Sequence, residues 1–423
     1  MTTPTQAPAS ENTAEGHIDP AARLADRRQP GIPESDSFVP VQTRSERPTS
    51  FDPGDFGTPT GTEVNWKHTP LKKLAALFVD EPAPHGVIDV AVRAPEGVEQ
   101  SRLAVGEAPR GEVFRPEDLP SAIAWAQEAE APLVRIPADV ELDEPIVVHL
   151  TGRGGVAHAH VVIEAQPHSR GTVILRHEGT AQQAQNIEII VRDGASLTVV
   201  SVQRWDDDAI HLASHQARVD RDASLTHVVV SLGGGIVRVN PSVELAGAGA
   251  DGKLYGLAFS DSGQHLESQV YLHHKGPHTV GDVLYKGALQ GAGARTVWIG
   301  DVLIGPDATG TDSYEANRNL VLTEGARADS IPNLEIETGD IVGAGHASAT
   351  GRFDDEQLFY LQARGIAEDE ARRLVVLGFL AEIVQKLDIP DLQDELIAAI
   401  EAELALTDSI AADAAEASTE ASA

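Results

Sequence analysis

Short apolar segments recur from Leu133 to Gly300, and glycine, aspartate and asparagine separate them. Part of this pattern also repeats as sequence. The run RDGASLT that begins at Arg192 resembles RDASLT, which begins at Arg221, and GADGKL follows at a similar interval from Gly249. A repeat of roughly twenty to thirty residues that holds several strands favours a β-solenoid, in which each coil buries its face on the next coil. A β-sandwich is the alternative, but it does not predict the repeat.

Changes of composition divide the chain into five parts. Residues 1–50 are rich in Pro, Thr, Ser, Glu and Asp, so we expect a disordered N-terminal arm with too few large apolar groups to bury. The other parts are a small helical or α/β cap (51–130), a β-helix core (131–353), a helical region (354–406) and an acidic disordered tail (407–423). The expected fold class is therefore mainly β.

Two short helices are expected in the cap. Apolar residues between Leu71 and Phe78 follow helical spacing, and residues 116–129 show a second helical pattern. Trp66 precedes the first of these helices, and an indole beside a turn is usually packed against a core or an interface. We therefore expect Trp66 to anchor the cap rather than to stack on a ligand.

The C-terminal region is expected to be helical. Asp354 and Gln357 have the spacing of a capping box at a helix start, and Gly365 suits the end of that helix. A second helix begins near Glu368, with apolar residues at every third or fourth position, and a third follows Pro390. The apolar faces of these helices require a partner surface, either within the chain or on another protein.

Composition excludes several classes of site. The 423 residues include no cysteine, so disulfides, zinc–thiolate sites and thiol nucleophiles are excluded, and a metal ligand must be His, Asp or Glu. The formal net charge of −33 opposes binding to nucleic acid or to an anionic membrane. The N-terminus has no secretory pattern, and no apolar run approaches the length of a membrane span. A cytoplasmic location is expected.

Several histidines could ligate a metal. His273, His274 and His278 form the densest group, but the residues between them are typical of a loop that leaves a strand. Surface positions or satisfied hydrogen bonds are favoured for two further pairs, which are His158 with His160 and His211 with His215.

Other signals of enzymatic chemistry are weak. The chain has no P-loop, no strand-flanked GxGxxG and no GxSxG elbow, and Gly233–Gly235 is expected to be a turn. A polysaccharide-active β-helix enzyme is the alternative from this class. Such enzymes use clustered acidic and basic residues, and Asp206–Asp208 is the comparable cluster here, although it is more typical of a solvated turn.

His346 differs from the other histidines because small residues surround it, from Gly343 to Gly351. Glycine and alanine allow a partner to approach the backbone closely and leave the imidazole uncrowded. From residue chemistry alone, a packed or capping histidine remains the favoured interpretation and a ligand role the alternative.

The sequence from His273 to Ile366 resembles the SufB/SufD family of iron–sulfur cluster assembly proteins. The resemblance rests on HHKGPHTVGDVLYKGALQGAGARTVWIGDVLIGPDATGTDSYEANRNL and on PNLEI, HASATG and DDEQLFYLQARGI after it. It extends more loosely over residues 131–272 and to WKHTPL near Trp66. It implies a right-handed parallel β-helix followed by a helical region.

The resemblance also implies a non-enzymatic subunit of a complex. In this family SufB and SufD pair through their β-helices, and each binds one copy of SufC, an ABC-type ATPase. The helices after the β-helix dock the ATPase. By this resemblance the contact residues here are Leu358, Phe359, Leu361, Arg364, Leu374 and Phe379.

Two positions, Asn317 and Ala347, make the resemblance closer to SufD, and a third, Ala344, departs from some SufD proteins. SufB-like sequences carry a cysteine where this chain has Asn317 and a glutamate where it has Ala347, and some SufD proteins carry a cysteine in place of Ala344. By the resemblance, His346 is a candidate ligand for iron or for a nascent cluster at the interface with SufB. The chain binds no cluster stably by itself, because clusters normally require thiolates, which the partner must supply. A SufB-like homodimeric scaffold is the remaining alternative.

Overall fold

The computed structural model describes Arg44 and residues 47–84, 86–353 and 355–404, without the side chains of 355–357 and 369. The acidic tail, almost all of the N-terminal arm and the expected cap at Asp354 lie outside these described residues.

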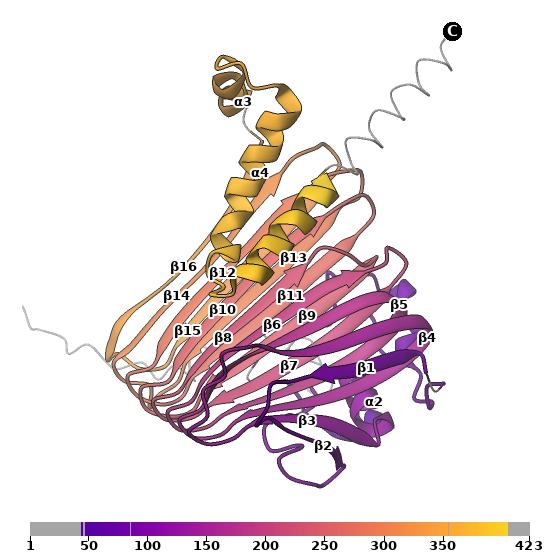
Figure 1. Cartoon of the computed structure of the whole chain (residues 1–423), viewed down its shortest axis with the longest axis vertical. Coiled ribbons are helices and arrows are strands. Elements are labelled where there is room, and N and C mark those ends of the chain that lie inside the picture. The colour runs from indigo at the N-terminus through magenta and orange to yellow at the C-terminus, as the bar shows by residue number, and fades with distance from the viewer. Residues whose placement is uncertain (1–43, 45–46, 85, 354, 405–423) are drawn as a thin grey trace, which may run out of the picture. The chain divides into compact units, whose positions relative to one another are not determined.

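The centre of the chain is a β-solenoid, and this confirms the expected mainly β fold class. Its strands are β4 (Ile146–Ala165), β5 (Arg170–Val191), β6 (Ser196–Trp205), β7 (Ile210–Val219), β8 (Ser224–Ser231), β9 (Ile236–Leu245), β10 (Asp251–Ser260), β11 (His265–His274), β12 (Val280–Leu289), β13 (Arg295–Ile304), β14 (Thr311–Val321), β15 (Arg327–Ile336) and β16 (Ile341–Arg352). Figure 1 shows their order along the solenoid.

Each coil after β5 contributes one strand to either side of the solenoid. Even-numbered strands pair in parallel from β6 to β16, odd-numbered strands pair from β7 to β15, and the long β5 joins the two series. The repeated sequence motif follows this register, because Ser196 aligns with Ser224, and Ser224 with Asp251. Alternate side chains point inward, and the apolar ones form the largest core cluster, which runs through the coils.

The cap covers the start of the solenoid. It comprises the strands β1 (Ile88–Arg93), β2 (Glu99–Ala104) and β3 (Glu130–Ile136), the helix α2 (Leu119–Gln127), and the 3-10 turns η2 (Pro53–Asp55), η3 (Leu71–Lys73) and η4 (Ala75–Phe78). β1 pairs antiparallel with β4, whereas β3 pairs parallel with it. The prediction for Leu71–Phe78 was wrong in type, because this segment forms two 3-10 turns that meet at Leu74 instead of one α-helix.

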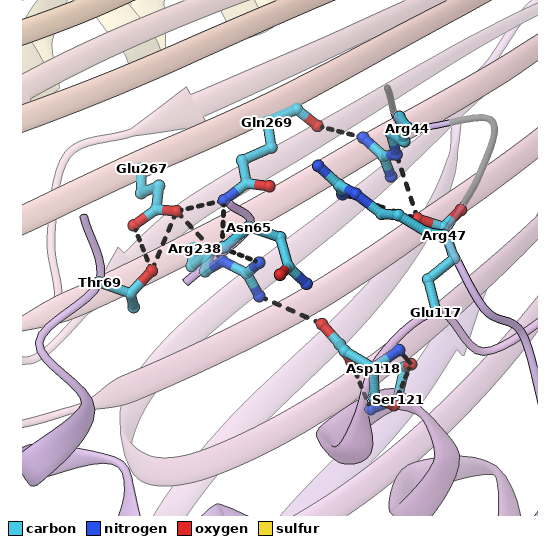
Figure 2. Close-up of polar contacts among 10 residues, drawn as sticks. All are labelled: Arg44, Arg47, Asn65, Thr69, Glu117, Asp118, Ser121, Arg238, Glu267 and Gln269. Carbon is cyan, nitrogen blue, oxygen red and sulfur yellow. Dashed lines mark hydrogen bonds and ion pairs between the residues drawn. The ribbon is translucent and has the colours of Figure 1, made fainter. Parts of the chain in front are cut away.

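A network of buried and half-buried polar groups fastens the segment before β1 and the start of α2 to the outer face of the odd-numbered strands (Figure 2). We call it the clasp, and it comprises Arg44, Asn65, Thr69, Glu117, Asp118, Arg238, Glu267 and Gln269. Arg238 forms an ion pair with Glu267 at 3.2 Å and lies 3.9 Å from the ring centroid of Trp66. Trp66 is buried here, as expected for an anchor.

The described C-terminal residues form three helices, which are α3 (Asp355–Gln362), α4 (Glu368–Val384) and a helix over residues 390–404. Two of the three, α4 and the last one, cover the outer face of the even-numbered strands, and α3 packs against α4. Buried side chains of the last two, such as Leu380 and Leu396, share one apolar cluster with Val228 and Leu257 of the solenoid. In Figure 1 these two helices lie along the solenoid near β10 and β12. The partner surface that their apolar faces require is therefore, in large part, the chain's own sheet.

Within the described residues, none of the helices combines the length and the apolar character that a membrane span requires.

Candidate functional site

His346 lies on the final strand of the solenoid. β16 pairs with β14 along one edge, and it ends the order of strands in the described sheet. In this register His346 aligns with Glu315, and its inward neighbour Ala344 packs against the central core. His346 therefore faces the interior of the last coil, while its side chain keeps 44% of its surface exposed through the open end.

Glu315 is the group that meets His346 inside this coil. Its carboxylate has no exposed surface, and neither oxygen has a hydrogen-bond partner. One oxygen, Oε1, lies 3.7 Å from His346 Nδ1. Across the interior, a Cβ atom on Gly300 would come within 2.4 Å of the other oxygen, so the glycine leaves room for the carboxylate. Burial, with a smaller contribution from the charge of Asp301, raises the pKa of Glu315 to about 8.

Asn317 and Ala347, the two positions that the resemblance compares with SufB-like sequences, lie close to this pair in the register of β14 and β16. Asn317 faces inward two residues after Glu315, where its side-chain amide donates to the backbone carbonyl of Tyr285 at 3.1 Å. Asn319 donates in turn to Asn317 at 2.7 Å. Ala347 aligns with Ala316, which faces the C-terminal helices, so position 347 points away from the interior.

A cleft of about 430 Å³ opens beside His346. Tyr271, Asp301 and Asn333 line it from the outer face, and Leu334 and His346 line it from the interior. The cleft gives a small ligand a route from solvent to the imidazole at the end of the solenoid.

The group at His273 does not form a metal site. His273 and His274 are consecutive residues of β11, so they point to opposite sides of the sheet. His274 is buried and hydrogen-bonded on both ring nitrogens, to Thr279 Oγ1 at 2.8 Å and to Ser313 Oγ at 3.0 Å. His278 lies in the following turn with a positive φ of 57°. The three imidazoles therefore do not converge.

Three of the four histidines in the other two pairs, His160, His211 and His215, are buried, and His158 is half-buried. His211 is buried and hydrogen-bonded to Gln203 and Gln185, and His215 is hydrogen-bonded to His227 at 2.9 Å. His160 is buried with its Nε2 atom 3.4 Å from Glu188. The three buried histidines are therefore internal, His211 has the satisfied hydrogen bonds that were the other expectation, and burial lowers the pKa of each of the three.

The two loops considered for enzymatic chemistry are turns. Asp206–Asp208 is exposed between β6 and β7, as expected for a solvated turn. Gly233–Gly235 joins β8 to β9, and a Cβ atom on Gly233 would come within 2.3 Å of the carbonyl oxygen of Trp205. The glycine is required there by close packing of consecutive coils.

The six candidate docking residues have different environments. Phe359, Leu374 and Arg364 are exposed, Leu361 and Phe379 are half-buried, and Leu358 is buried. Phe379 packs against the solenoid, where Lys286 donates to its backbone carbonyl at 2.8 Å. Tyr360, beside Phe359, is also exposed and adds to the apolar surface at this end of the helices.

Glu315 is the residue of this site that our sequence reasoning missed. From Ser313 to Asn319 every second residue faces inward, and these inward residues are polar. An acidic residue, Glu315, therefore occupies an inward position of the kind that holds Val or Leu in other strands. This run of polar residues at inward positions is the sequence signal that could have identified Glu315. Within the described residues no set of three or more His, Asp or Glu side chains is arranged to hold a metal. The arrangement at His346 supplies one imidazole and one carboxylate.

Comparisons with known proteins agree with this architecture. The family model described as "SUF system FeS cluster assembly, SufBD core domain" matches residues 148–379. An iron–sulfur cluster assembly SufBD family protein of Mycobacterium tuberculosis H37Rv is 47% identical over 377 residues, which cover 87% of this chain and 95% of that protein. A relative from Mycobacterium leprae with the same description is 46% identical over 85% of this chain and 94% of that protein.

A second SufBD family protein of Mycobacterium tuberculosis H37Rv is more distant. It is 29% identical over 201 residues, which cover 48% of this chain and 24% of that protein. The same organism thus holds two proteins of this description that differ in their similarity to this chain. The coverage by the family model and by the first relatives is decisive, and the chain belongs to the SufBD family of iron–sulfur cluster assembly proteins.

Proposed function

We propose that this chain is the SufD-type, non-enzymatic subunit of a cytoplasmic iron–sulfur cluster assembly complex. It pairs with a SufB-type protein through the open end of its solenoid and binds the ATPase SufC through its C-terminal helices. The observation that carries the proposal is His346, an exposed imidazole at the end of the solenoid in a family whose described role is cluster assembly.

The open end has the properties of a pairing surface. β16 is the last strand of the described sheet, so its outer edge leaves backbone groups available to a strand of another protein. Exposed apolar side chains lie in the last coils at Tyr314, Ile336 and Val342, with 51%, 44% and 75% of their surface accessible. Exposed apolar surface of this kind is typical of protein–protein contacts.

The absence of cysteine from the whole sequence supports a paired role over a homodimeric scaffold. Iron–sulfur clusters are held mainly by thiolates, and two copies of this chain would supply none. In the proposed complex the SufB-type partner contributes the thiolates, and this chain contributes His346. The cluster is the product that is assembled and passed on.

The exposed end of the helical region is the proposed docking surface for SufC. Phe359 and Leu374 are exposed there, whereas the apolar residues further along α4 are buried on the solenoid. A force applied at this end would reach the even-numbered strands through α4, which contacts β10 and β12.

Co-expression with the cognate SufB-type and SufC proteins tests the proposal. We expect a stable ternary complex on gel filtration, and we expect His346→Ala to leave the complex intact while lowering its iron and sulfide content. A chain that elutes alone would overturn the proposed partnership. Unchanged cluster content in the variant would return His346 to a structural role.

A further inference from the structure

The environment of Glu315 does not resemble that of a structural carboxylate. Burying a carboxylate is costly unless hydrogen bonds or an opposite charge compensate it. Neither oxygen of Glu315 accepts a hydrogen bond, and among the described residues His346 is the one basic side chain within ion-pair range of it. Other inward groups of these coils, Trp298 Nε1 and Ser330 Oγ, also lack partners. The interior of the last coils thus holds polar atoms that remain available to a ligand.

The spacing of the two side chains suits a shared metal ion. The 3.7 Å between Glu315 Oε1 and His346 Nδ1 is too long for a hydrogen bond. Metal–ligand bonds to nitrogen and oxygen are about 2.0–2.2 Å long. Two such bonds that span this distance meet at an open angle, somewhat wider than tetrahedral, so one ion fits between the atoms with little movement of either side chain.

We propose that Glu315 and His346 together form a two-ligand site for a divalent first-row transition metal. An imidazole nitrogen suits iron and zinc, and a carboxylate oxygen is also a good ligand for manganese, so the pair suits these ions better than magnesium or calcium, which prefer oxygen ligands alone. This inference deepens the proposed function and rests on it for the identity of the metal, which would be the iron that enters the cluster. Glu315 holds the ion from inside the coil, and His346 holds it from the side of the cleft.

The arrangement leaves the remaining coordination positions directed toward the open end. A site with two protein ligands is weak in the isolated chain and becomes strong when a partner adds ligands. Iron would therefore be retained mainly in the assembled complex, at the place where the partner's thiolates arrive.

Manganese binding tests the inference without requiring cluster assembly. Electron paramagnetic resonance of free Mn²⁺ at neutral pH gives the dissociation constant for the full chain, alone and in its complex with the SufB-type protein. We expect Glu315→Gln and His346→Ala each to weaken binding at least tenfold, and the double variant to be little worse than either one. Glu335→Gln is the matched control, because Glu335 lines the same cleft and is exposed.

The results of these binding measurements distinguish a failure of the metal site from a failure of the proposed function. If Glu315→Gln binds Mn²⁺ as tightly as the wild type, or if the wild type binds none in either state, the two-ligand site is wrong. The ternary complex would still support the function in that case. If Mn²⁺ binding depends on Glu315 but no complex with the SufB-type protein forms, the site stands and the proposed function fails.

Discussion

Glu267 and Glu315 are two carboxylates with no exposed side-chain surface, and the protein treats them differently. Glu267 lies in the clasp, where it accepts hydrogen bonds from Thr69 Oγ1 and Gln269 Nε2 and contacts Arg238 (Figure 2). It also contacts His265 at 2.8 Å. Glu315 lies inside the last coil with no hydrogen-bond donor. The chain itself supplies the hydrogen bonds and the opposite charge that Glu267 requires. Among the described residues, Glu315 has neither a hydrogen bond nor a buried cation, which leaves its oxygens available to a ligand.

The pKa values of the two groups move in opposite directions. Burial by itself opposes the ionisation of Glu267, but the hydrogen bond with His265, the charge of Arg238 and the bond from Gln269 outweigh it and lower the pKa to about 2. At Glu315 burial is unopposed and raises the pKa to about 8. A buried carboxylate that has hydrogen bonds and a cationic partner stabilises the fold, whereas one without them destabilises it. Carboxylates with pKa values perturbed in this way concentrate at functional sites.

The largest expected effect comes from removing the compensation in the clasp. Arg238→Ala leaves Glu267 buried without its cationic partner, which typically costs about 3–5 kcal/mol. We expect a correspondingly lower free energy of unfolding in urea, followed by tryptophan fluorescence. Arg221→Ala is the control, since the Arg221 side chain is 65% exposed and its ion pair with Asp193 contributes at most about 1 kcal/mol. Equal effects of the two substitutions would contradict a structural role for the clasp.

Glu315→Gln is expected to stabilise the protein at alkaline pH. Because the folded-state pKa of about 8 is above the ordinary value of 4.5, the wild type loses stability as pH rises from 4.5 through 8. The neutral amide removes this loss, and each pKa unit corresponds to about 1.4 kcal/mol. Thermal melts by circular dichroism at pH 5 and pH 9 should coincide at the lower pH and separate at the higher. A variant that is less stable at pH 9 would contradict this account.

Glu267→Gln should produce the opposite pH dependence. The folded-state pKa of about 2 is below 4.5, so the wild type gains stability from ionised Glu267 above pH 4.5 and loses it as pH falls toward 2. The variant is less stable at neutral pH and lacks this loss in acid. Melting temperatures measured from pH 2.5 to pH 7 should therefore converge at the acidic end. Parallel curves would show that Glu267 titrates outside this range.

The smallest effect on stability is expected at the proposed docking surface. Phe359 is 72% exposed, so Phe359→Ala should change the free energy of unfolding by no more than about 0.5 kcal/mol. Phe379→Ala, which removes packing against the solenoid and the contact with Lys286, should destabilise the protein measurably. Calorimetric titration with SufC should show weaker binding for Phe359→Ala. Unchanged binding would remove Phe359 from the docking surface.

The solenoid could be predicted from the sequence because its coils repeat. Inward and outward side chains alternate along every strand, and the sequence repeat at Arg192, Arg221 and Gly249 carries the register from one coil to the next. The spacing of apolar residues at every third or fourth position likewise predicted α2 and the C-terminal helices. The small residues around His346 also marked it as unusual.

The pairing of Glu315 with His346 depends on the number of residues in the last coil, which could not be predicted from the sequence pattern. Glu315 meets His346 because the register shifts between Thr311 and Asp312, leaving Val342 as an extra residue on β16. A slip of one residue would turn His346 to the outer face, because side chains alternate with a period of two.

Contacts between distant segments were likewise decided by the tertiary structure. Thr69 reaches Glu267 across 198 residues of sequence, and the turns η3 and η4 replace the expected helix where the chain packs against the sheet. Alternation and helical spacing are local properties, so the sequence alone determined the solenoid and its helices. The partners of Glu267 and Glu315 depend on how the coils stack and on what covers them, and only the folded chain decides that.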